Sequence, residues 1–150
     1  MKILGTTLSF VVLMGLSACQ RYAEIYSVTF RSKSGAVLAS GTIKLKTPLP
    51  AEGRIKGAYR LKTASQRPEG KEAEWFYRLL RDKEKGEMEW RMQPGQPEDW
   101  QYAFDFMPGM ADANLVGNSP KLKDGKTIGW WLYSTFSGGG RGGTIELQRE

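Results

Sequence analysis

Apolar and polar side chains alternate along most of the chain after position 25, which is the pattern of half-buried β-strands. The clearest case runs from Met88 to Met92, where three large apolar side chains alternate with Glu89 and Arg91. The pattern predicts nine strand segments, at 26–30, 37–45, 55–62, 75–81, 88–92, 100–106, 114–117, 128–136 and 144–149. The segment 55–62 carries Lys56, Arg60 and Lys62 on one side, so its outer face should be basic.

One of these segments also fits a helix. The aromatic run from Trp75 to Tyr77 favours a strand, whereas the glutamates and leucines between Glu72 and Arg81 favour a helix. The strand is the prediction adopted here, and the helix is its alternative.

Turn-forming residues divide the segments. Ser32 to Gly35 and Asp124-Gly125 read as hairpin turns. A glycine-rich run at 137–143 is typical of a loop. Its G-x-G-x-x-G spacing does not indicate a nucleotide-binding site, because a strand and not a helix follows it. Many short strands with regular turns predict an all-β protein. An antiparallel up-and-down β-barrel of about eight strands is the expected fold, with a β-sandwich as the alternative.

The barrel would resemble lipocalins and avidins in outline, although the early Gly-x-Trp fingerprint of lipocalins is missing from this sequence. The resemblance therefore concerns architecture and implies no particular ligand.

The first residues have a different pattern. Lys2 precedes an unbroken run from Ile3 to Leu16 that is largely apolar. As a helix this run would span about 21 Å, which is short for a hydrocarbon core of about 30 Å but typical of a signal peptide. Ser17 and Ala18, both small, then precede Cys19.

The sequence Leu16-Ser17-Ala18-Cys19 resembles the lipobox of bacterial lipoproteins. The resemblance implies that residues 1–18 are a signal peptide, cut off after Ala18, and that Cys19 carries the lipid. Residues 19–24 would be a short tether and 25–150 a single barrel domain. Gln20, in place of aspartate, implies sorting to the outer membrane in a Gram-negative cell, with the domain at its periplasmic face.

The composition excludes several kinds of catalytic and metal site and indicates the charge of possible partners. The chain has no histidine and a single cysteine, so it cannot build a Ser-His-Asp or Cys-His catalytic site, a Cys/His zinc site or an internal disulfide. The formal net charge is +6, and loss of Lys2 with the signal peptide leaves +5. A basic surface attracts anionic partners such as lipid headgroups or phosphate-bearing glycolipids. Nucleic acid is not expected as a partner, because the chain carries an export signal.

Large aromatic side chains on several predicted strands could line a ligand cavity inside the barrel. The candidate lining residues are Trp75, Tyr77, Trp90, Trp100, Tyr102 and Trp130. The alternative is that these rings simply fill the core. Trp130 and its neighbour Trp131 must face opposite ways in a regular strand, so at most one of them points inward.

The predicted function is therefore binding rather than catalysis, without a cofactor or a metal. Under the first hypothesis, a hollow barrel binds an apolar or glycolipid-like envelope ligand. Under the second, a filled barrel serves as a structural, interaction or inhibitor lipoprotein that docks another envelope protein.

Overall fold

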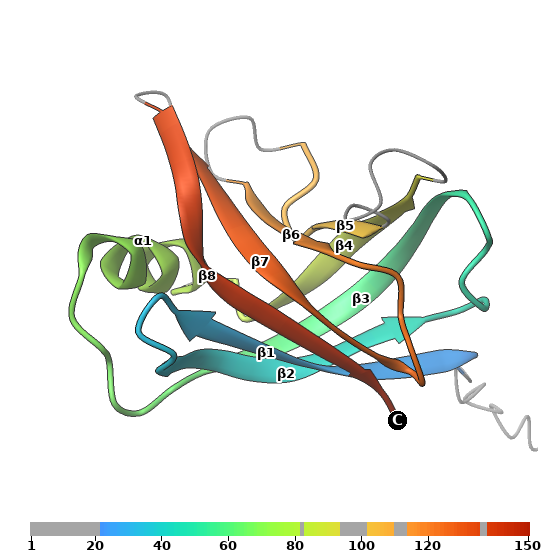
Figure 1. Cartoon of the computed structure of the whole chain (residues 1–150), viewed down its shortest axis with the longest axis horizontal. Helices are drawn as coiled ribbons and strands as arrows, with labels where there is room; N and C mark the ends of the chain where they lie inside the picture. The colour runs from blue at the N-terminus through green and yellow to red at the C-terminus, as the bar shows by residue number, and fades with distance from the viewer. Residues whose placement is uncertain (1–21, 82, 94–101, 110–113, 136–137) are drawn as a thin grey trace, which may run out of the picture.

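The protein is an eight-stranded barrel with one helix at its end (Figure 1). The computed structural model describes residues 22–81, 83–93, 102–109, 114–135 and 138–150. The elements are β1 (Glu24–Ser32), β2 (Val37–Leu45), β3 (Gly53–Thr63), α1 (Lys71–Leu80), β4 (Lys85–Met92), β5 (Tyr102–Asp105), β6 (Leu115–Ser119), β7 (Lys126–Thr135) and β8 (Gly138–Arg149).

Every strand pairs antiparallel with the next one along the chain, and β8 returns to pair with β1. The closing seam places Val28 opposite Leu147 and Phe30 opposite Ile145. A closed sheet leaves no strand edge unpaired. The predicted up-and-down barrel is confirmed, and the β-sandwich alternative is wrong.

The barrel interior is built by the period-two alternation of its strands. On β1, Tyr26, Val28 and Phe30 point inward and are at most 1% exposed. On β4 the predicted alternation from Met88 to Met92 holds, with the three apolar side chains inside. The largest side chains buried below 2% exposure include Trp90, Trp131, Tyr26, Phe30, Phe76, Phe104 and Phe106.

The predicted strand at 75–81 is wrong, because residues 75–80 lie in α1 and Arg81 is its C-cap. Ala73, Phe76, Tyr77 and Leu80 are buried, and their spacing places them on one face of a helix. The aromatic residues are thus apolar contacts of a helix, and tertiary packing overrides their preference for strands. α1 lies at one end of the barrel, beside the turn between β1 and β2 (Figure 1), where Lys33 forms a 2.7 Å ion pair with Glu72.

Both predicted hairpin turns are present. Asp124 and Gly125 have φ of 53° and 75°, as a type I′ turn requires, and Lys123 and Lys126 exchange two backbone hydrogen bonds across them. The amide of Gly35 donates to the carbonyl of Ser32 at 3.0 Å.

The predicted glycine loop is corrected. Gly138 to Gly143 belong to β8 and pair with β7, whereas residue 137 lies outside the described residues. Glycine is needed there because Trp131 packs against the backbone. A Cβ on Gly142 would lie 2.0 Å from the Trp131 ring.

Candidate functional site

Two of the predicted cavity-lining residues meet inside the barrel. Trp90 on β4 is fully buried, and its ring centroid lies 5.7 Å from that of Tyr102 on β5. Trp90 also lies 4.9 Å from Tyr26 and 4.3 Å from Phe104. These are the ring distances of packed aromatic pairs in edge-to-face arrangement, so other side chains of the chain already pack around Trp90.

Trp75 and Tyr77 lie elsewhere, on α1. Trp75 packs against Trp131 and Tyr133, with ring centroids 6.3 Å and 5.1 Å apart. The Tyr77 ring lies under the guanidinium of Arg67 at 5.0 Å. Both side chains therefore help to hold α1 and its preceding loop on the barrel, and neither meets Trp90.

Trp130 lies on the outer face of β7, and Trp131 on the inner face, as the alternation requires. The guanidinium of Arg141 stands 4.9 Å from the Trp130 ring centroid. Trp100 and the predicted lipidation site Cys19 lie outside the described residues, as do residues 1–18. Among the placed candidates, only Trp90 and Tyr102 come together.

Buried tyrosines surround this interior. Burial raises the pKa of Tyr26, and the hydrogen bond that its hydroxyl donates to Glu24 Oε2 at 2.7 Å raises it further. Burial also raises the pKa of Tyr59, whose hydroxyl donates to the Lys83 carbonyl at 3.0 Å, and of Tyr102. These phenols are therefore neutral donors in the folded protein at ordinary pH.

A few buried polar atoms have no hydrogen-bond partner, among them Trp90 Nε1 and Ser119 Oγ. Such atoms are uncommon in native proteins. Two residues of the predicted cavity lining carry such an atom, Trp90 at Nε1 inside the barrel and Tyr77 at its hydroxyl on α1.

The outer surface carries a different kind of site, which the aromatic candidates did not indicate. A pocket of about 640 Å³ opens where β3 continues past the start of β4. The Leu61 amide donates to the Glu84 carbonyl at 2.6 Å, which joins β3 to the segment leading into β4. The lining residues are Arg60, Leu61, Lys62, Thr63, Arg81, Glu84 and Lys85.

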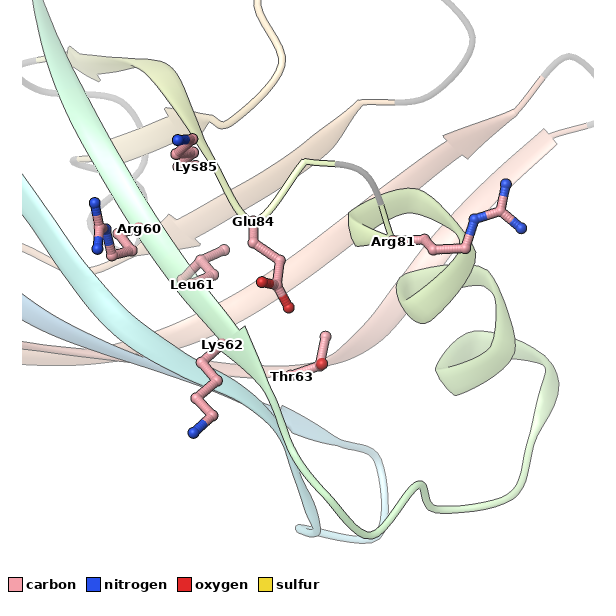
Figure 2. Close-up of a pocket in the computed structure, with 7 residues that line it drawn as sticks. All are labelled: Arg60, Leu61, Lys62, Thr63, Arg81, Glu84 and Lys85. Carbon is pink, nitrogen blue, oxygen red and sulfur yellow. The ribbon is translucent and has the colours of Figure 1, made fainter.

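Figure 2 shows Arg60 and Lys62 on one side of β3, with Lys85 at the start of β4 and Glu84 between β3 and the end of α1. A second pocket, of about 670 Å³, shares Arg60 and Lys85 with the first. It extends toward Tyr22, whose ring lies 5.3 Å from Lys44 Nζ. We call the two pockets together the basic groove, after its cations Lys44, Arg60, Lys62, Arg81 and Lys85.

The basic groove has several cations but Glu84 as the one acid among the residues that line its two pockets. Arg60, Lys62 and Lys85 are exposed, and none makes an ion pair with a residue that the structure describes. By contrast, cations elsewhere on the barrel do, for example Lys126 with Glu146 at 2.6 Å and Arg149 with Glu24 at 3.5 Å.

Sequence alternation predicts only part of this groove. The basic outer face of β3 follows from the spacing of Arg60 and Lys62, but Lys85 joins them through strand register, which pairs it with Arg60. The charged run from Lys83 to Lys85 is the signal that could have suggested it.

Comparison with protein-family models, with curated proteins and with solved structures gives no match for the chain. Among the described residues, no helix is both long and apolar enough to cross a membrane. In that same part of the chain, no group of three or more acidic, histidine or cysteine side chains could hold a metal ion.

Proposed function

We propose that this chain is a lipid-anchored envelope lipoprotein whose barrel binds its partner through the outer surface. The resemblance of Leu16-Ser17-Ala18-Cys19 to a lipobox supports the anchor and, with Gln20, an outer-membrane location. The anchor would hold the barrel close to the membrane, because β1 begins at Glu24, only five residues after Cys19.

The observation that carries the outer-surface function is the packed interior. Phe30 meets Phe76 at 5.3 Å and Phe106 at 5.4 Å, while Trp131 meets Phe76 at 5.2 Å. Phe104 packs on Trp90 and lies 6.5 Å from Phe106, so these rings and those around Trp90 form one connected set. Small-molecule sites need several hundred Å³ of free space. The packing therefore favours the filled-barrel hypothesis over the hollow one.

The anchor is tested by replacing the acylated residue. Cys19→Ser should abolish palmitate labelling and release the protein from the membrane fraction, because one thioether and its chains are what hold it there. Ser17→Ala is the matched control, since it keeps a small residue before the cleavage site. Unchanged labelling and fractionation of Cys19→Ser would contradict the proposal.

A second candidate function, binding of a small ligand inside the barrel, is favoured by one observation, the unpartnered Trp90 Nε1. Native mass spectrometry of the protein extracted from its membrane separates the two functions. A filled barrel predicts only the mass of the chain with its covalent lipid. A further, non-covalent mass that disappears in Trp90→Phe, which lacks the indole N–H, would support the internal ligand instead.

A further inference from the structure

The basic groove holds like charges directly opposite each other. Strand register places Arg60 on β3 opposite Lys85 on β4, and Lys62 lies two residues further along the same side of β3. Like charges directly opposite on paired strands destabilise a sheet. The fold retains this arrangement without a described acid paired to any of the three. An anion from outside the chain would relieve the repulsion.

The donors that line the groove suit a phosphate group. Each of its two pockets, at about 640 and 670 Å³, lies within the size range of small-molecule sites. Arg60 and Lys85 line both pockets, so a phosphate between them would meet cations from two strands. A guanidinium offers paired donors to phosphate oxygens, and lysines add point charges. Glu84 lines only the first pocket, which leaves the second without an acidic lining residue.

The groove is also near the point where the chain segment from the proposed anchor joins the barrel. Tyr22 lines the second pocket and packs against Lys44. Cys19 precedes Tyr22 by three residues, and a chain spans at most about 3.6 Å per residue. The lipidated residue therefore lies within roughly 11 Å of the Tyr22 Cα atom, so a lipid on Cys19 brings this groove to the headgroup layer.

Resting on the anchor proposed above, we propose that Arg60, Lys62 and Lys85 bind the phosphate of an anionic phospholipid headgroup in the membrane that holds Cys19. The lipid supplies attachment, and the basic groove supplies orientation, because it turns the outer face of β2, β3 and β4 toward the bilayer. The opposite side of the barrel then faces away from the membrane.

The test uses the full lipidated protein in vesicles of phosphatidylcholine, with and without phosphatidylglycerol. The rate of lysine acetylation, followed by mass spectrometry, reports which side chains the surface covers. Lys62 and Lys85 should react several-fold more slowly in phosphatidylglycerol vesicles, while Lys33 and Lys71 should react equally in both. Protection should weaken at high ionic strength, where the Debye length falls to about 3 Å.

Two double variants distinguish binding by the basic groove from attraction by the overall positive charge of the protein. Arg60→Gln with Lys85→Gln should remove the protection of Lys62 in phosphatidylglycerol vesicles. Lys33→Gln with Lys71→Gln removes the same charge beside α1 and should leave that protection intact. Equal loss in both variants would overturn the groove assignment.

The remaining outcomes are also decisive. Equal protection by inorganic phosphate with neutral vesicles would overturn the headgroup assignment in favour of a soluble phosphate. Protection only in native envelope membranes would indicate an acidic protein partner instead. If the protein stays bound to neutral vesicles but Lys62 and Lys85 are not protected in anionic vesicles, the groove proposal fails and the anchor proposal stands. If the protein binds anionic vesicles with Lys62 and Lys85 protected but dissociates from neutral vesicles, the anchor proposal fails and the groove proposal stands.

Discussion

At the residue scale, the absence of a side chain at Gly142 makes room for the ring of Trp131. Trp131 is fully buried, its Nε1 donates to the Arg31 carbonyl at 2.8 Å, and its ring covers the Gly142 backbone. Gly142→Ala would place a methyl carbon 2.0 Å from that ring, so Trp131 must shift. We expect a loss of about 1–3 kcal/mol in the free energy of unfolding, measured in urea.

Gly140→Ala is the matched control for this prediction. It lies on the same strand, and its added carbon would meet only the outer end of the Tyr133 side chain, at 3.3 Å. Its free energy of unfolding should stay much closer to that of the wild type. Equal losses at the two positions would contradict the packing of Trp131 on Gly142.

The buried tyrosines predict a loss of stability at alkaline pH. Burial raises the pKa of Tyr26, Tyr59 and Tyr102 above that of an unfolded chain, which is about 10. Stability from a raised pKa is fully present below the unfolded value and is lost as the pH climbs toward the folded one. The melting temperature should therefore fall as the pH passes about 10.

Tyr26→Phe tests this pH dependence directly. Phenylalanine keeps the ring but cannot ionise, so the alkaline fall in melting temperature should be shallower than in the wild type. At neutral pH the variant also loses the hydrogen bond to Glu24, which contributes on the order of 1 kcal/mol. An equally steep alkaline fall would show that Tyr26 is not one of the groups responsible.

At the scale of elements, α1 closes one end of the barrel through Phe76. Its side chain is fully buried and meets Phe30 and Trp131 at about 5 Å. Phe76→Ala should lower the free energy of unfolding by about 3–5 kcal/mol in urea. Arg78→Ala, an exposed change on the same helix, should stay within about 0.5 kcal/mol. Similar effects of the two changes would show that α1 does not pack as described.

The strands were predictable because each carries its own alternation, which is a local signal. α1 was predicted only as the alternative to a strand, because three adjacent aromatic residues prefer strands locally, while the contacts that hold them in a helix lie on β1 and β7. The glycine strand was missed for the same reason, since its partner Trp131 is on β7. The basic groove was predictable only in part. Arg60 and Lys62 share one strand, but the register that places Lys85 beside Arg60 cannot be read from the sequence of β3 or of β4 alone.

At the scale of the whole molecule, stability depends on closing the sheet. Seven residue pairs join β1 to β8, from Tyr26 with Arg149 to Ser32 with Gly143. Ending the chain after Gly143 removes all but the last of these pairs and leaves β1 and the first half of β7 with free edges. Unpaired edges recruit other chains, and the cut also removes the buried side chains of Ile145 and Leu147. The shortened protein should aggregate on size-exclusion chromatography and lose its cooperative thermal transition.

Removing Glu150 alone deletes an exposed residue beyond β8 and should preserve a soluble, cooperatively folded barrel. A monomeric, cooperatively melting product of the larger truncation would mean that the remaining strands close without the seam.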